Sequence, residues 1–296
     1  MPSVIGVDLG GTKCAVRRYD AKTLEEEAFE QIPTQAEKGF DDVFRRCVGL
    51  IQQLSTKGTQ SIGIGVPGFV TYPEGTVLTL PNIDGVHNIP LKEKLTKILH
   101  LPVFVDNDVH CTALAEAHYG AGKGLSVVVV VAAGTGVGGG IVIDGKLLRG
   151  SHGFAGEVGR MLLVPGQPPY ETNDKRGDVE QFLSGTSLKK RCPEAKNPQE
   201  YLMGETCSAI HDSVVRETAW LCASLTHLLD PSIIIFAGSA GRPLEPYLKD
   251  IYSELTHWVL PGTPIPKLAI AERKDAATLG AALLTMEPMK NTNASW

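Results

Sequence analysis

The amino-acid sequence predicts an α/β protein with two lobes and a cleft between them. The chain has 296 residues, and at about 100–200 residues per domain this length suggests two domains. Short apolar runs alternate with stretches whose apolar residues recur at helical spacing, which is the pattern of strands and helices that follow one another. Each half of the chain also contains two strand-like runs joined by a glycine-rich tip. A unit that occurs once in each half favours a duplicated, two-lobed architecture.

The first half of the chain opens with a predicted β-hairpin. Residues 4–8 form a short apolar run that ends at a carboxylate, residues 9–13 turn the chain, and residues 14–19 alternate apolar and polar side chains. The other elements expected in this half are a helix over 40–54, a strand over 61–68, a helix over 91–99, a strand over 101–105 and a helix over 112–119. We expect residues 1–115 to form the N-terminal lobe, completed by a C-terminal helix over 276–290.

The second half repeats this pattern and is expected to form the C-terminal lobe, residues 116–275. Residues 125–143 carry no charge and could be mistaken for a membrane span. Their five glycines, however, lie together after a valine run, which indicates two strands around a glycine turn at 134–136. The other elements expected in this lobe are an Asp-Gly hairpin tip at 144–145, a helix over 205–229 and a strand over 232–237. The final small-residue helix, over 276–286, belongs to the N-terminal lobe.

Composition and charge exclude several classes of protein. Lys and Arg number 28 against 33 Asp and Glu, a net charge of −5, and no basic run interrupts this balance. A nucleic-acid partner therefore has no electrostatic support. The six cysteines are scattered without a C-x-x-C pair, which favours free thiols in a reducing compartment. Because the first residues also lack the regions of a signal peptide, we expect a cytoplasmic protein without a membrane partner.

Three glycine-rich turns, at 10–13, 134–140 and 238–241, each follow a predicted strand. Such a turn presents successive backbone N–H groups, and glycine lets the backbone approach an anion closely. One turn alone is most often only a tight turn, but three in one chain favour a cleft that binds phosphate groups. Residues 134–139 also spell G-x-G-x-x-G, the dinucleotide fingerprint, which requires a following helix. Residues 140–145 predict a strand and a hairpin tip instead, which argues against a dehydrogenase.

Carboxylates lie beside two of the predicted strand ends. Asp8 precedes the first glycine turn, where it could hold Mg²⁺ against phosphate groups or cap the turn. Asp106, Asn107 and Asp108 follow the strand over 101–105, and alternation along a strand directs Asp106 and Asp108 to one side. A carboxylate at a strand end is rigidly placed to take a proton from a hydroxyl, and the alternative role is a helix cap. Two further carboxylates could accept hydrogen bonds from a polyol or be solvated surface charges, namely Glu157 and Glu180.

These motifs resemble those of the ROK kinases (repressor, open reading frame, kinase), within the superfamily of sugar kinases, heat-shock proteins and actin. Asp8-Leu9-Gly10-Gly11-Thr12-Lys13 looks like the first phosphate motif, and Val105-Asp106-Asn107-Asp108 is similar to the catalytic segment. Further similar motifs are the sugar-binding pair Pro81-Asn82, the second phosphate loop at 134–140, Ala155-Gly156-Glu157-Val158-Gly159, the adenosine turn at 238–241 and the closing helix at 279–282. The resemblance covers residues 4–285 and implies a ribonuclease H-like, actin-like ATPase fold with a cleft between two lobes.

The resemblance implies an ATP-dependent carbohydrate kinase that phosphorylates a hexose or hexose derivative, of the glucokinase or N-acetylhexosamine kinase kind. Asp108 would be the general base that takes the proton of the acceptor hydroxyl. The residues that would bind the sugar are Asn82, Asn107, Glu157, Arg160 and Glu180. The residues that would bind ATP are Asp8, Gly10, Gly11, Thr12, Lys13, Gly134, Thr135, Gly136 and Gly238. Asp8 would lie near Mg²⁺, and homodimers are usual in the family.

The chain departs from the family where ROK kinases bind zinc. Their motif has a His at the position of Arg160, and this His binds zinc with three cysteines of a following C-x-C-G-x-x-G-C-x-E segment. Residues 161–180 contain no Cys and no His, and structural zinc needs about four such ligands, so we expect no zinc site. We expect Arg160 instead to pair with Asp174, Asp178 or Glu180, or to reach an acidic or phosphorylated substituent on the sugar.

Two functions other than a kinase are compatible with this family. A sugar-responsive repressor needs an N-terminal DNA-binding module, and the first predicted strand begins at Val4, which leaves no room for one. The remaining alternative is a catalytically inactive sugar sensor or regulator without a DNA-binding module. Asp108 and three glycine turns together favour the kinase, because sensing alone would not require them.

Overall fold

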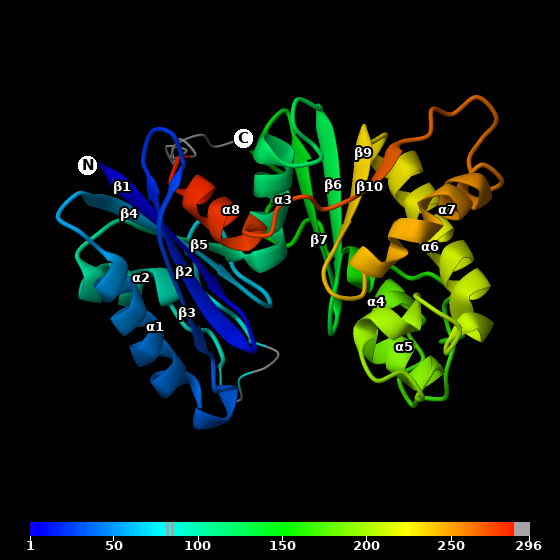
Figure 1. The fold of residues 1–296 in the computed structure, drawn as a ribbon, viewed down its shortest axis with the longest axis horizontal. Coiled ribbons are helices and arrows are strands. Elements are labelled where there is room, and N and C mark those ends of the chain that lie inside the picture. The colour runs from blue at the N-terminus through cyan, green and yellow to red at the C-terminus, as the bar shows by residue number, and fades with distance from the viewer. Residues whose placement is uncertain (81–82, 84–85, 287–296) are drawn as a thin grey trace. The chain divides into compact units, whose positions relative to one another are not determined.

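The computed structural model describes residues 1–80, 83 and 86–286, and this part of the chain forms two compact units. Unit 1 contains Met1–Ala115, Ser151–Phe154 and the C-terminal segment from Asp275. Unit 2 contains Glu116–Gly150 and Ala155–Lys274. Each unit has a five-stranded sheet with helices packed against it (Figure 1).

The sheet of unit 1 has the strand order β3-β2-β1-β4-β5. Its strands are β1 (Ser3–Leu9), β2 (Lys13–Asp20), β3 (Glu26–Pro33), β4 (Thr59–Val66) and β5 (Val103–Asn107). β1 pairs antiparallel with β2, and β2 with β3, whereas β1, β4 and β5 are parallel neighbours. The carboxyl ends of β1, β4 and β5 therefore meet at one end of the sheet. The helices of this unit are α1 (Phe40–Leu54), α2 (Leu91–Leu99), the first part of α3 (Asp108–Tyr119) and α8 (Ala276–Leu284).

Side chains of β1 alternate between two helical layers, as the period of a strand requires. Ile5 and Val7 belong to an apolar cluster that includes Ile51 of α1. Val4 belongs to a second cluster, which includes Leu279 of α8. The short apolar run at the start of the sequence is therefore buried on both faces.

Glycines let α8 lie directly on the backbone of this sheet. A Cβ atom at Gly6 would lie 1.9 Å from the carbonyl oxygen of Thr278, and one at Gly63 would lie 1.7 Å from that of Ala281. These separations are far below van der Waals contact, so only glycine fits at both positions. The closing helix is thus part of the core of the unit that contains the first strand.

The sheet of unit 2 has the strand order β10-β9-β6-β7-β8. Its strands are β6 (Val127–Ala133), β7 (Val137–Ile143), β8 (Lys146–Leu147), β9 (Ile233–Ala237) and β10 (Lys267–Ile270). β6 pairs antiparallel with β7 and parallel with β9. Its α-helices are α4 (Val179–Leu183), α5 (Gly185–Arg191), α6 (Ser208–Leu229) and α7 (Leu248–Leu255). Short 3-10 helices in the two units are η1 (Ala36–Lys38), η2 (Val158–Arg160), η3 (Pro198–Tyr201) and η4 (Arg242–Tyr247).

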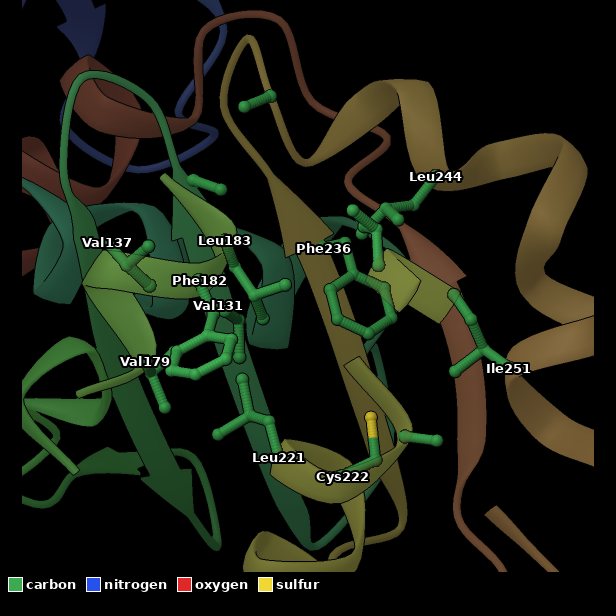
Figure 2. Packing of buried hydrophobic residues seen from close by; sticks show 14 of the residues in the cluster. Val131, Val137, Val179, Phe182, Leu183, Leu221, Cys222, Phe236, Leu244 and Ile251 are labelled. Atoms are coloured by element: carbon green, nitrogen blue, oxygen red, sulfur yellow. The ribbon is translucent and has the colours of Figure 1, made fainter. Parts of the chain in front are cut away.

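An apolar core lies between the sheet of unit 2 and its helices (Figure 2). Val131 of β6 and Phe236 of β9 share this core with Leu221 and Cys222 of α6 and with Phe182 of α4. All five side chains are at most 4% exposed, and burying a large apolar side chain stabilises a fold by about 1.5–3 kcal/mol. This packing fixes α4 beside β7, which matters because α4 carries Glu180.

A disulfide bond joins Cys192 and Cys207 in the connection between α5 and α6. The expectation of free thiols is therefore wrong for this pair. Their Cα atoms lie 5.8 Å apart, a distance that tertiary packing sets and that a sequence separation of 15 does not reveal. The other four cysteines are buried and form no disulfide bond, namely Cys14, Cys47, Cys111 and Cys222.

The main elements expected from the sequence are confirmed. β1 and β2 form the opening hairpin, and residues 125–143 contain β6 and β7. Asp144 and Gly145 at the next hairpin tip have φ values of 48° and 73°, the left-handed conformation that this turn requires. Within the described residues, no helix has both the length and the apolar character needed to cross a membrane. The sequence patterns do not predict β3, β10, α4, α5 or α7.

Candidate active site

Three aspartates lie at the carboxyl end of the parallel strands in unit 1, namely Asp8, Asp106 and Asp108. In the sheet, Asp8 of β1 is in register with Gly65 of β4, and Gly65 is in register with Asp106 of β5. Asp108 follows as the first residue of α3. A Cβ atom at Gly65 would lie 3.2 Å from the Cα atom of Asp108 and 3.2 Å from Sγ of Cys111. The glycine therefore lets the start of α3 pack closely against the end of β4.

The carboxyl group of Asp108 influences the protonation of the Asp8 carboxyl. Burial and, after it, the nearby charge of Asp108 raise the pKa of the Asp8 carboxyl to about 7, against the lowering effects of Lys13 and Arg17. Burial also raises the pKa of the Asp108 carboxyl above its ordinary value, although the N–H of Val109 donates to it at 2.9 Å. Such a pair favours a group that neutralises it, either a proton or a cation.

The neighbouring polar residues have internal hydrogen-bond partners. Asn107 caps α3, because its Oδ1 accepts from the N–H groups of Val109 at 2.8 Å and His110 at 3.2 Å. Its Nδ2 donates to the carbonyl of Gly68 at 3.0 Å. Asp106 is 5% exposed and contacts Nδ1 of His110 at 2.7 Å. The helix cap considered for this segment is thus supplied by Asn107. The sequence predicted that strand alternation directs Asp106 and Asp108 to the same side. This prediction is wrong, because β5 ends at Asn107 and Asp108 belongs to α3.

The first glycine turn is tied to residue 34 by two hydrogen bonds. The N–H of Gly10 donates to the carbonyl of Lys13 at 2.9 Å and so closes the turn. Thr34 donates its hydroxyl to the carbonyl of Gly10 at 2.6 Å and its N–H to that of Thr12 at 2.9 Å. Gly11 is half-buried, and Thr12 and Lys13 are exposed. The tip is therefore held in place from one side, and Thr12 and Lys13 remain accessible on it.

The second glycine turn, in unit 2, is held by residues from α4 and α5. The N–H of Gly185 donates to the carbonyl of Gly134 at 2.8 Å, and the hydroxyl of Thr186 donates to that of Thr135 at 2.8 Å. The N–H of Val137, which follows the turn, donates to Oε2 of Glu180 at 2.9 Å. A segment distant in sequence thus holds Gly134, Thr135 and the flanking Val137.

Arg160 pairs with carboxylates, which confirms one of the two alternatives expected for it. Its Nη1 lies 3.0 Å from Oε1 of Glu180 and 3.5 Å from Oδ2 of Asp178. Asp178 is 1% exposed and also lies 3.3 Å from Nη1 of Arg176. Two arginines therefore neutralise this buried carboxylate.

Hydrogen bonds and a β-bridge hold together the segment where the family resemblance implies a zinc site. The amide of Gln181 accepts from the N–H of Gly177 at 2.7 Å and donates to the carbonyl of Asp174 at 2.8 Å. A β-bridge between Leu162 and Asp178 joins the two ends. Within the described residues, no group of three or more His, Cys, Asp and Glu side chains could hold a metal ion. These residues do not fit a structural zinc.

The third glycine turn follows β9 and covers the end of β6. Gly238 has a φ of 83°, and a Cβ atom there would lie 2.2 Å from the carbonyl oxygen of Ala133. The same carbonyl accepts from the N–H groups of Ala240 at 2.9 Å and Gly241 at 3.2 Å. Glycine is therefore required at 238 on two independent grounds.

The other residues expected in the site are located as follows. Glu157 is half-buried in unit 2, where it precedes η2, and its carbonyl accepts from the N–H of Arg160 at 3.0 Å. Asn82 lies outside the described residues. The sequence patterns assign no role to the segment from Ser184 to Thr186, although a Ser-Gly-Thr run before a basic stretch is typical of a helix start.

The comparisons with known proteins define the class of this protein. The family model "ROK family" matches residues 4–287. The chain is 30% identical to a glucokinase of Thermotoga maritima, covering 96% of this chain and 97% of the relative. It is also 30% identical to an N-acetyl-D-glucosamine kinase of Pectobacterium atrosepticum, covering 94% and 97%.

Solved structures agree with this assignment. The ROK hexokinase of Thermus thermophilus is similar with a TM-score of 0.81 and 29% identity, over 95% of this chain and 97% of that chain. A ROK family glucokinase from Streptomyces griseus, in complex with glucose and AMPPNP, gives a TM-score of 0.76 and 29% identity over 95% and 98%. The expected actin-like ATPase fold is confirmed, and the protein is a carbohydrate kinase of that class. The chain belongs to the ROK family.

Proposed function

We propose that this protein transfers the γ-phosphoryl group of ATP to a hydroxyl of a hexose or hexose derivative, with Asp108 as the general base. The observation that carries this proposal is the position of Asp108 at the start of α3, half-buried and with a pKa raised by burial. A raised pKa suits a group that must take a proton near neutral pH. The names of the relatives support glucose and N-acetylglucosamine as the first sugars to test.

The glycine turns would bind the nucleotide. Backbone N–H groups at 11–13 and 135–136 would bind phosphate oxygens, while the N–H groups of Gly10 and Gly134 close the two turns. Gly238 would lie under the adenosine. Asp8 is a suitable ligand for Mg²⁺, because this cation prefers carboxylate oxygens. Burial also leaves the negative charge of the Asp8 carboxylate poorly solvated, so a cation beside it would stabilise it. The bound cation would neutralise charge on the phosphates, while the protein positions the reacting groups.

The sugar hydroxyls would be bound by the remaining residues. Each carboxylate oxygen has two lone pairs, so Glu180 keeps acceptor capacity beside its contacts to Val137 and Arg160. Asn107 has less remaining capacity to bind a sugar hydroxyl, because its amide already makes three hydrogen bonds within the protein. Glu157, Arg160 and Asn82 complete the proposed set. The homodimer and the cytoplasmic location remain predictions.

The test of the proposed base is Asp108→Asn. This variant should keep the fold and the sugar affinity but lower kcat by at least about 100-fold, the usual scale of general-base catalysis. Asp106→Asn is the control, because Asp106 is 5% exposed and contacts His110. It should lower stability and leave turnover of the folded protein near that of wild type. Near-normal turnover of Asp108→Asn would remove Asp108 from this role. Sugar binding without any turnover by wild type would favour the sensor.

A further inference from the structure

The turn at 134–136 depends on a carboxylate that is itself held in place. Glu180 uses one oxygen to accept from the N–H of Val137 at 2.9 Å and the other to contact Nη1 of Arg160 at 3.0 Å. The two contacts occupy opposite oxygens of one carboxylate. The orientation of the carboxylate is therefore set by the arginine on one side and by the backbone on the other.

The turn is shaped to receive this carboxylate. A Cβ atom at Gly136 would lie 2.4 Å from Oε2 of Glu180, which is closer than any side chain could approach. The space that a side chain at 136 would fill is thus taken by the carboxylate oxygen that binds Val137. The glycine and the glutamate are complementary, and neither contact depends on a bound ligand.

Arg160 differs from the second arginine of this segment in what it contacts. Arg160 reaches both Glu180 and Asp178, whereas Arg176 is paired with Asp178 and Asp174. Both side chains are about half exposed, at 42% and 51%. Only Arg160 therefore connects directly to the carboxylate that holds the turn, and Arg176 offers a matched comparison.

We infer that Arg160 is a positioning residue for the nucleotide: it holds the Glu180 carboxylate against the N–H of Val137 and so keeps the turn at 134–136 ready to bind the phosphates of ATP. This inference deepens the proposed function, on which it rests for the identity of the ligand. It gives Arg160 an effect on the phosphate groups in addition to the sugar contact proposed above. Arg160 exerts this effect through Glu180, without a contact of its own to the nucleotide.

The first test removes the guanidinium in Arg160→Met and measures two quantities that need no turnover. The Kd for AMPPNP should rise about threefold, the scale of a partly exposed ion pair, while the Kd for adenosine, which has no phosphates, should stay unchanged. Hydrogen exchange of the segment 134–140 in the free protein should become faster. Arg160→Lys, which keeps the charge, should recover part of both effects.

The control is Arg176→Met, which should leave AMPPNP affinity and exchange of 134–140 unchanged. A double-mutant cycle adds a second readout. In a Gly136→Ala background the new methyl group displaces the carboxylate, so Arg160→Met should then have little further effect. Unchanged AMPPNP affinity in Arg160→Met, equal effects of Arg160→Met and Arg176→Met, or a change in sugar affinity alone would each overturn the inference. Because binding and exchange are measured without catalysis, absence of kinase activity would refute only the proposed function.

Discussion

The raised pKa of Asp8 predicts a specific dependence of stability on pH. The pKa of this carboxyl is about 7 in the folded protein and 3.8 ordinarily. Between these values the folded protein holds a proton that the unfolded chain has released, so the free energy of unfolding should fall as pH rises from about 4 to about 7. A gap of about three pH units corresponds to at most about 4 kcal/mol. Asp8 is only half-buried, so solvent screening reduces the expected effect to about 2 kcal/mol.

Asp8→Asn removes this titration, and the difference between variant and wild type isolates it from all other groups. Urea unfolding would be measured from pH 4.5 to 8 without divalent cations. At low pH the two proteins should have similar free energies of unfolding, apart from any effect of replacing a protonated carboxyl by an amide. At pH 8 the free energy of unfolding of the variant should be higher by about 2 kcal/mol. Asp108→Asn should move the fall in stability toward lower pH, since the charge of Asp108 contributes to the shift. Parallel stability curves for wild type and Asp8→Asn would refute this reasoning.

Two further predictions concern unit 2. Gly238→Ala should lower the free energy of unfolding by more than about 3 kcal/mol, because left-handed strain adds to the clash with the carbonyl of Ala133. The control is Gly204→Ala, where φ is 84° and the surrounding space is open, and its loss in the same urea titration should be only about 1–2 kcal/mol. Equal losses in the two variants would show that the clash has no effect. For the disulfide between Cys192 and Cys207, thiol titration of the denatured protein should count four thiols before reduction and six after it. Reduction should lower the free energy of unfolding by about 3 kcal/mol for a loop of this length, and six thiols without reductant would contradict the bond.

Local sequence patterns were sufficient to predict a strand or turn where the residues of that segment alone determine its conformation. The alternation of residues 14–19, the valine run before the turn at 134–136 and the Asp-Gly tip at 144–145 each fix a strand or a turn within a few residues. The sequence did not predict β3, because this strand is mostly exposed and rich in glutamate. Such a composition is unfavourable for strands in general, although it is suitable for a strand at the edge of a sheet.

The candidate site was predictable as a set of residues but not as a set of contacts. The glycine turns and Asp108 stand out by residue type, whereas the pairing of Glu180 with Val137 joins residues 43 positions apart. Alternation misjudged Asp106 because it continued the strand one residue too far, and Asp106 is instead buried beside His110. Tertiary packing decides such cases, and no single segment contains that information.

The contact of α8 with Gly6 and Gly63 has a consequence for biosynthesis. The ribosome produces the strands of unit 1 first, yet the helix that covers one face of this sheet is made only after all of unit 2. Domains generally fold as units while the chain emerges. We therefore expect unit 2 to complete its core first. During synthesis, the face of the N-terminal sheet that α8 covers at Gly6 and Gly63 therefore stays without this helix until α8 has left the ribosome.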